Sequence, residues 1–190
     1  MLEIRIHGRA GQGAKTIAQF LAEIGIKKGQ FVQAFPSYGP ARTGAAMNAY
    51  VRLDQTSILV HSEIKNPDIV VIIDPLLVEV ENVVKGLKNK GIIIMNSPYE
   101  AQEEKNKLIK KFGLNKQAKV YVLPASAIAY RILKKDLPNM VLLGALIKVA
   151  KVAEFDDLAE VIKNNFIKKY GEEMTRANIE AAENGYKIIN

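Results

Sequence analysis

The chain has 190 residues, 48% of them hydrophobic and 25% charged, which is enough for one sizeable core, so we expect a single domain over residues 1–190. It has no signal-peptide pattern and no apolar run of the roughly 18 residues that a membrane span needs, which predicts a cytoplasmic protein that contacts no membrane. The net charge is +7, but the lysines are interleaved with glutamates and only 7% of residues are aromatic, so we expect no nucleic-acid binding.

The first part of the chain predicts a strand, a glycine turn and a helix. Residues 2–7 alternate apolar and polar side chains, which is typical of a strand. The helix that follows carries apolar residues at helical spacing and ends near Gly29. Two more strands are expected at 31–35 and 47–53, as an antiparallel or edge pair, with a loop rich in glycine and proline at 36–44 between them.

The middle of the chain predicts a buried parallel sheet. Strands at 69–74, 91–95 and 120–123 are almost entirely apolar, as expected where helices cover both faces of a sheet. Helices are expected between them, at 76–88 and 99–112. The fold class is therefore three-layer α/β/α with a mainly parallel, mixed sheet.

After Pro124 the pattern predicts only helices, which form a helical C-terminal tail. These helices are expected at 128–134, 139–152, 157–169 and 175–187.

Residues 8–16, Gly-Arg-Ala-Gly-Gln-Gly-Ala-Lys-Thr, lie between the first strand and the first helix. Glycines allow positive φ and close approach of a ligand, and the start of a helix offers unpaired N–H groups, so the turn is suited to an anion. The alternative is a turn needed only for tight packing of the strand against the helix.

The spacing of these residues disfavours two familiar phosphate loops. A dinucleotide fingerprint needs a glycine where Thr16 stands, and an acidic residue near the end of the second strand, where the chain has Phe35 and Pro36. A Walker A loop has lysine directly after its last glycine, whereas here Ala14 intervenes and turns Lys15 by about 100° around the helix. An independent nucleotide-binding protein or NTPase is therefore kept only as the alternative.

Few other residues suggest chemistry. The chain has no cysteine, so it cannot ligate an iron–sulfur cluster in the usual way. His7 and His61 have no neighbours in sequence that would orient them for catalysis. Asp74, after a buried strand, either caps the next helix or faces a ligand. The acidic residues lack metal-ligand spacing, so we expect no catalytic residue and no metal site.

Two motifs, residues 8–13 (GRAGQG) and 33–45 (QAFPSYGPARTGA), resemble the gamma subunit of 2-oxoacid:ferredoxin oxidoreductases, most closely that of pyruvate synthase. Residues 138–146 and 178–186 agree more loosely with the same subunit. The chain departs from the family pattern in having Ala10 where many relatives have glycine, and an alanine at position 41 where glutamate is frequent.

The resemblance implies a subunit of an enzyme that decarboxylates a 2-oxoacid, pyruvate above all, on thiamine diphosphate. Such an enzyme passes electrons through iron–sulfur clusters to ferredoxin and forms CO2 and an acyl-CoA, here acetyl-CoA. It implies alpha-, beta- and delta-type partner subunits that hold these cofactors, so this chain alone binds none and is inactive in isolation. The role implied for the chain is assembly and binding of coenzyme A (CoA).

Six residues of the two loops are expected to contact CoA or a neighbouring subunit: Arg9, Gly11, Gln12, Gly13, Lys15 and Arg42. The backbone of residues 11–13 would donate hydrogen bonds to a phosphate, with charge from Arg9 and Lys15. Arg42 would bind a phosphate in two-pronged fashion. The alternative is that Arg9 and Arg42 form ordinary salt bridges between subunits.

Overall fold

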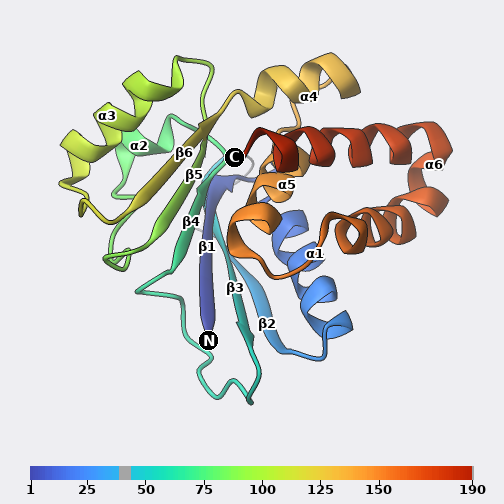
Figure 1. Ribbon diagram of the computed structural model, residues 1–190, viewed down its shortest axis with the longest axis horizontal. Coiled ribbons are helices and arrows are strands. Elements are labelled where there is room, and N and C mark those ends of the chain that lie inside the picture. The colour runs from blue at the N-terminus through green and yellow to red at the C-terminus, as the bar shows by residue number, and fades with distance from the viewer. Residues whose placement is uncertain (39–43, 190) are drawn as a thin grey trace.

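The computed structural model describes residues 1–38 and 44–189, which contain a six-stranded sheet in the order β2-β3-β1-β4-β5-β6 (Figure 1). Strands β1, β4, β5 and β6 are parallel, whereas β3 is antiparallel to both β1 and β2. The strands are β1 (Leu2–Arg9), β2 (Phe31–Tyr38), β3 (Ala46–Asp54), β4 (Ile69–Ile72), β5 (Ile92–Asn96) and β6 (Lys119–Leu123). The prediction of a mixed sheet with an antiparallel pair at one edge is confirmed.

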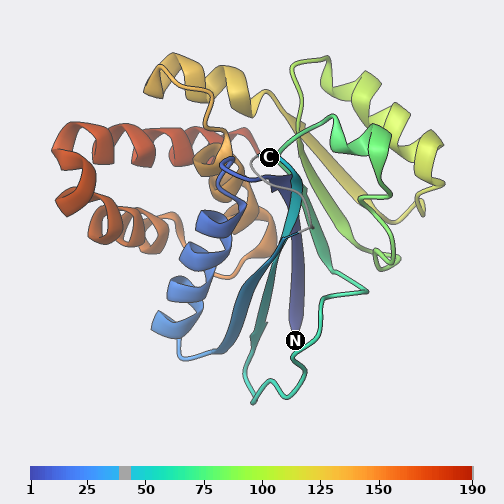
Figure 2. The same cartoon turned by 180° about the vertical axis from the view of Figure 1, so that it is seen from behind.

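Helices cover both faces of this sheet. Figures 1 and 2 show α1, α5 and α6 on one face and α2 and α3 on the other, with α4 near the carboxyl ends of the parallel strands. The helices are α1 (Ala14–Lys27), α2 (Leu77–Val80), α3 (Ala101–Phe112), α4 (Ala125–Leu133), α5 (Asn139–Ala150) and α6 (Phe155–Ile188). The three-layer α/β/α architecture is confirmed.

The strands distribute their side chains between two hydrophobic cores. The four residues of β4 are buried and alternate between a core shared with α1 and α5 and a core shared with α2 and α3. In β1, Ile4 and Ile6 enter the first core, whereas Arg5 and His7 point to the opposite face. The sequence of β1 alternates because only one of its faces enters this core, whereas β4 is continuously apolar because both of its faces are buried in hydrophobic cores.

Two glycines let α5 and the second half of α6 pack closely. A Cβ on Gly144 would lie 1.8 Å from the carbonyl oxygen of Ala182, and one on Gly185 would lie 1.8 Å from that of Val141. No larger residue fits at either position without moving the helices apart.

Helix α6 bends sharply at Gly171, where φ is 78° and ψ is 176°. The sequence predicts separate helices at 157–169 and 175–187, and the structure joins them across this kink. Only glycine adopts such a backbone conformation at little cost. Within the described residues, no helix is both long and apolar enough to cross a membrane.

The predicted helix at 76–88 is wrong in extent, because α2 spans only Leu77–Val80. Glu81 leaves the helix with extended backbone angles, φ −145° and ψ 159°. The next residues turn so that the carbonyl oxygens of Val83 and Lys85 accept hydrogen bonds from Arg5, at 3.1 and 2.7 Å. These two carbonyl groups thus accept hydrogen bonds from a distant buried arginine instead of from backbone N–H groups of a longer helix.

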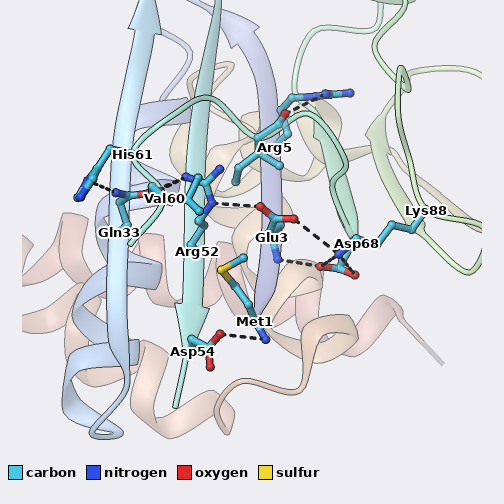
Figure 3. A network of polar contacts seen from close by, with 11 residues as sticks. Met1, Glu3, Arg5, Gln33, Arg52, Asp54, Val60, His61, Asp68 and Lys88 are labelled. Atoms are coloured by element: carbon cyan, nitrogen blue, oxygen red, sulfur yellow. Dashed lines mark hydrogen bonds and ion pairs between the residues drawn. The ribbon is translucent and has the colours of Figure 1, made fainter. Parts of the chain in front are cut away.

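On the face away from α1, strands β1 to β3 are crossed by the β3–β4 connection, residues 55–68, which we call the strap. Figure 3 shows Arg52 of β3 bonded to Glu3 of β1, Gln33 of β2 and the Val60 carbonyl of the strap, at 3.1, 2.6 and 3.4 Å. Gln33 also contacts His61 of the strap at 2.8 Å. This face is therefore closed by polar contacts.

Candidate functional site at the glycine turn

The predicted strand–turn–helix unit is confirmed, with α1 beginning directly after Gly13. Gly11 and Gly13 have φ values of 98° and 87°, a region that favours glycine. The first intrahelical bond is from Ile17 N–H to Gly13 C=O, at 3.0 Å, so the N–H groups of residues 14–16 have no acceptor within the helix. Gly13 supplies no side-chain cap. The turn therefore presents helix N-terminal donors, as an anion site requires.

Arg9 and Gln12 hold the turn in place from the other side. The Arg9 Nε donates to the Asp74 Oδ2 at 2.5 Å, and its Nη1 donates to the Gly44 carbonyl at 3.1 Å. The Gln12 side chain accepts the Arg9 backbone N–H at 2.8 Å and lies 3.5 Å from Asp74. The Arg9 charge is thus paired within the chain.

Asp74 is buried at the carboxyl end of β4, with 6% of its surface exposed. Its Oδ1 accepts the N–H of Leu76 at 2.9 Å, where the short helix α2 begins. The sequence left a helix cap and a ligand contact open for this residue. Asp74 thus bonds to the residue before α2, whose N-cap, Leu76, receives no side-chain cap, and the same carboxylate also binds Arg9, a partner 65 residues away in the sequence.

A cavity of ≈ 510 Å³ lies on the opposite side of the turn, between α1, the α4–α5 connection and α6. Gly11, Gly13 and Thr16 line one end. Phe20, Phe166 and Tyr170 form an aromatic wall, with successive ring centroids 5.5 and 5.1 Å apart. The polar residues around it include Lys135, Asn139, Asn165, Lys169 and Asn178. Residues of the glycine turn, two lysines and an apolar wall therefore line one cavity.

Asn139, the first residue of α5, was not predicted as a site residue. Its side chain lies so close to Gly13 that a Cβ there would be 2.5 Å from the Asn139 Nδ2. It is 9% exposed and lines the cavity. The signal in the sequence is a polar residue after Pro138, at the start of an otherwise apolar helix.

His7 and Arg5 form a second buried polar group behind the turn. The Arg5 Nε donates to the His7 Nε2 at 2.9 Å, so His7 carries its proton on Nδ1 and donates it to Glu81, 3.1 Å away. Burial lowers the pKa of His7 below its ordinary 6.5; the bond to Glu81 opposes this shift and the Arg5 charge adds to it. The bond from His7 lowers the pKa of Glu81. His7 is therefore a buried, hydrogen-bonded histidine.

The structure separates the predicted site residues into groups. Gly11 and Gly13 line the cavity, Arg9 and Gln12 bind Asp74, and Lys15 is exposed at the second position of α1. Arg42 lies outside the described residues. Across residues 1–38 and 44–189, no group of three or more histidine, aspartate or glutamate residues is arranged to hold a metal ion.

Residues 3–188 match the model of the family described as pyruvate ferredoxin/flavodoxin oxidoreductase. The chain belongs to the pyruvate ferredoxin/flavodoxin oxidoreductase family. One similar protein is the pyruvate synthase subunit PorC of Thermotoga maritima, 40% identical over 98% of this chain and 94% of the relative. Another is the pyruvate/ketoisovalerate oxidoreductases common subunit gamma of Pyrococcus furiosus, 39% identical over 96% of each chain.

Solved structures agree with the membership in the pyruvate ferredoxin/flavodoxin oxidoreductase family. The crystal structure of pyruvate oxidoreductase subunit PORC from T. maritima matches with a TM-score of 0.84 and 38% identity, over 98% of this chain and 95% of that one. The 2-oxoglutarate:ferredoxin oxidoreductase of Magnetococcus marinus shares the fold, at a TM-score of 0.79 and 24% identity, over 100% of this chain and 31% of that one. The chain is the gamma subunit of a pyruvate/2-oxoacid ferredoxin oxidoreductase complex.

Proposed function

We propose that this gamma subunit receives CoA for a pyruvate synthase, which oxidises pyruvate to acetyl-CoA and CO2 and passes the electrons to ferredoxin. The names of the similar proteins support pyruvate as the 2-oxoacid. Alpha-, beta- and delta-type sister subunits would complete the complex. The chain would act as one gamma-type domain over residues 1–190.

The absence of cysteine supports a division of labour between the subunits. Thiamine diphosphate, when bound in a sister subunit, would stabilise the carbanion that decarboxylation leaves, and iron–sulfur clusters would carry the electrons. Both would lie in the sister subunits, because clusters are held by cysteine thiolates that this chain lacks. The gamma chain alone would then be inactive, and its residues would bind and position CoA rather than react.

The observation that carries the CoA proposal is the cavity beside Gly11 and Gly13. The N–H groups at the start of α1 would bind a phosphate of CoA, and the positive end of the helix dipole would favour its charge. Lys135 and Lys169 would add positive charge, and the apolar wall suits the less polar parts of the molecule. Asn139 would donate from its amide, next to Gly13.

The two predicted arginines would act differently from one another. Arg9 would fix the turn through Asp74 and Gly44, because its guanidinium is already paired there. Arg42 would supply a two-pronged contact to phosphate from the second loop, with Lys15 contributing charge at the start of α1. These roles make Arg42 and Lys15 candidates for ligand contact and Arg9 a positioning residue.

The test uses the whole complex, purified with its sister subunits, and follows reduction of a viologen dye with pyruvate. The double variant Lys135→Ala/Lys169→Ala should raise the KM for CoA about tenfold, a change of about 1.4 kcal/mol, while the KM for pyruvate stays the same. Arg42→Ala should act in the same direction. Lys168→Ala, an exposed neighbour on α6, is the matched control.

Three results would contradict this proposal. Dye reduction that does not depend on CoA would show that CoA is not a substrate of the complex. If the double variant forms an intact complex and its KM for CoA is unchanged, the cavity is not the binding site for CoA. A colourless chain that purifies alone and hydrolyses ATP would favour the alternative of an independent nucleotide-binding protein. Assays with 2-oxoglutarate, branched-chain 2-oxoacids and indolepyruvate beside pyruvate would establish the substrate.

A further inference from the structure

The cavity beside the glycine turn extends along an aromatic wall to the bend of α6 (Figure 1). Phe20 follows Thr16 by about one turn of α1, so the wall begins next to the glycine turn. The ring centroids of Phe20 and Phe166 are 5.5 Å apart, and those of Phe166 and Tyr170 are 5.1 Å apart. Phe20 is buried, whereas Phe166 is partly buried and Tyr170 is 48% exposed. The accessible part of the wall is therefore formed by the two rings of α6.

Lys169 marks the end of this wall that lies away from the turn. Its Nζ is 5.1 Å from the ring centroid of Tyr170, an arrangement in which the ring attracts the ammonium group. Among the described residues, neither Lys169 nor Lys135, the other basic residue of the lining, forms an ion pair, whereas Lys27 and Lys28 of α1 are paired with carboxylates of α6. The cavity thus has a cation, placed by an aromatic ring, that is open to an anionic ligand.

The lining of the cavity is positive rather than mixed in charge. None of the described residues that line it is acidic. Three carboxylates lie near the two lysines in sequence: Asp136 next to Lys135, and Glu172 and Glu173 beyond the bend that follows Lys169. All three are exposed and outside the lining. A ligand in the cavity therefore meets ammonium groups, amides and aromatic rings.

We propose that Phe166 and Tyr170 bind the adenine ring of CoA and that Lys169 binds the phosphate on the 3′-oxygen of its ribose. This rests on the proposed function, in which another phosphate of CoA lies at the glycine turn. The adenosine of CoA carries a diphosphate on its 5′-oxygen and a single phosphate on its 3′-oxygen. The cavity offers the same order, with a helix start, an aromatic surface on which a base stacks and a lysine for the second phosphate. Its volume of ≈ 510 Å³ is typical of small-molecule sites.

A consequence of this arrangement is selectivity for CoA over dephospho-CoA, which lacks only the 3′-phosphate. In the whole purified complex, assayed with pyruvate and a viologen dye, the KM for dephospho-CoA should be about tenfold above that for CoA, as expected for one lost charge-assisted hydrogen bond. Lys169→Ala should raise the KM for CoA to that for dephospho-CoA and leave the latter unchanged. Lys169→Arg should keep the selectivity, because it keeps the charge, and the control Lys168→Ala should match the wild type.

Calorimetry on the same complex gives a readout that does not depend on turnover. Adenosine 3′,5′-bisphosphate and AMP differ only in the 3′-phosphate. The wild type should bind the bisphosphate about tenfold more tightly, and Lys169→Ala should bind the two equally. Tyr170→Leu should weaken the binding of both, because it removes a ring on which the adenine stacks.

The outcomes separate this inference from the proposed function. A wild type that uses dephospho-CoA as well as CoA would overturn the inference, and so would a Lys169→Ala complex that still selects CoA. In either case a raised KM for CoA in the Lys135→Ala/Lys169→Ala complex would leave CoA in the cavity. If neither the single nor the double variant changes the KM for CoA, the inference and the proposed CoA site both fail.

Discussion

The two faces of β1 to β3 are closed in opposite ways. Toward α1, α5 and α6 the strands present apolar side chains, and glycines let two of the helices touch backbone to backbone. On the other face the same strands present Arg5, His7 and Arg52, each less than 10% exposed, under the strap. The first face depends on shape, whereas the second depends on directional hydrogen bonds to specific groups (Figure 3).

This difference explains how the glycine turn is held. The apolar face sets the position of α1 and α5, and so of Gly13 against Asn139. The polar face sets the position of the segment after β4, through Arg5, His7 and Arg9. Close packing tolerates some exchange of apolar residues, but a hydrogen bond to a buried group requires its particular donor.

The largest expected effect tests the apolar face at Gly185. Gly185→Ala places a methyl group where the Val141 carbonyl lies, so α5 and α6 must separate, and we expect the free energy of unfolding to fall by about 3 kcal/mol. Gly113→Ala is the control, because no atom lies within 4 Å of its Cβ position and only its φ of 58° is strained, at about 1 kcal/mol. Urea unfolding of the purified chain measures both. Equal losses would show that the contact with the Val141 carbonyl is not what makes Gly185 necessary.

The next effect tests the polar face at Arg5. Arg5→Met keeps an apolar stem but leaves the carbonyls of Ile64, Val83 and Lys85 without their donor, and we expect a loss of about 2 kcal/mol. Hydrogen exchange should rise in the strap and in residues 81–85. Lys85→Met, at an exposed position, should change stability by less than about 0.5 kcal/mol. A loss without faster exchange in those segments would mean that Arg5 does not hold them.

The dependence of stability on pH tests His7. Because the pKa of His7 is lower in the folded chain than its ordinary 6.5, the unfolded chain takes up a proton first as the pH falls. The contribution of His7 is complete above pH 6.5 and declines below it, by at most about 1.4 kcal/mol per pH unit. The other charged groups that act on the ring, Arg5 and Glu81, keep their charge states between pH 6.5 and 5.

His7→Asn cannot titrate but keeps a donor near Glu81, so it should lack this part of the slope. The lowered pKa of Glu81 predicts a further loss of stability below about pH 4.5, as that carboxylate takes up a proton. Thermal unfolding at steps between pH 7 and 4 separates the two ranges. Identical slopes for the wild type and His7→Asn between pH 6.5 and 5 would contradict the prediction.

Local sequence pattern predicted what depends on local chemistry. The strand–turn–helix unit followed from residues 2–29, because the period of apolar residues and the glycines determine it without help from elsewhere. The length of α2 did not, since the residues after it bond to a distant partner, with the Val83 carbonyl accepting from Arg5, 78 residues earlier in the sequence.

The same distinction applies to the candidate site. Gly11 and Gly13 were predicted from their spacing, and both have positive φ. The sequence predicts a helix that begins at Asn139, but only the fold brings its side chain against Gly13. The pairing of Arg9 with Asp74 could not be predicted either, because no local rule chooses among 20 acidic residues.

The smallest expected effect is that of Lys88→Ala, which tests whether burial or the number of charges makes the contacts of the polar face stabilising. Lys88 contacts Asp68 at 2.8 Å and Glu3 at 3.7 Å, but its side chain is 42% exposed. Lys88→Ala should therefore cost at most about 0.5 kcal/mol, and less in high salt, because water screens exposed pairs. Lys90→Ala, at an exposed neighbouring position, is the control. If Lys88→Ala cost as much as Arg5→Met, the number of charges would stabilise this face; a small loss means that burial gives its hydrogen bonds their strength.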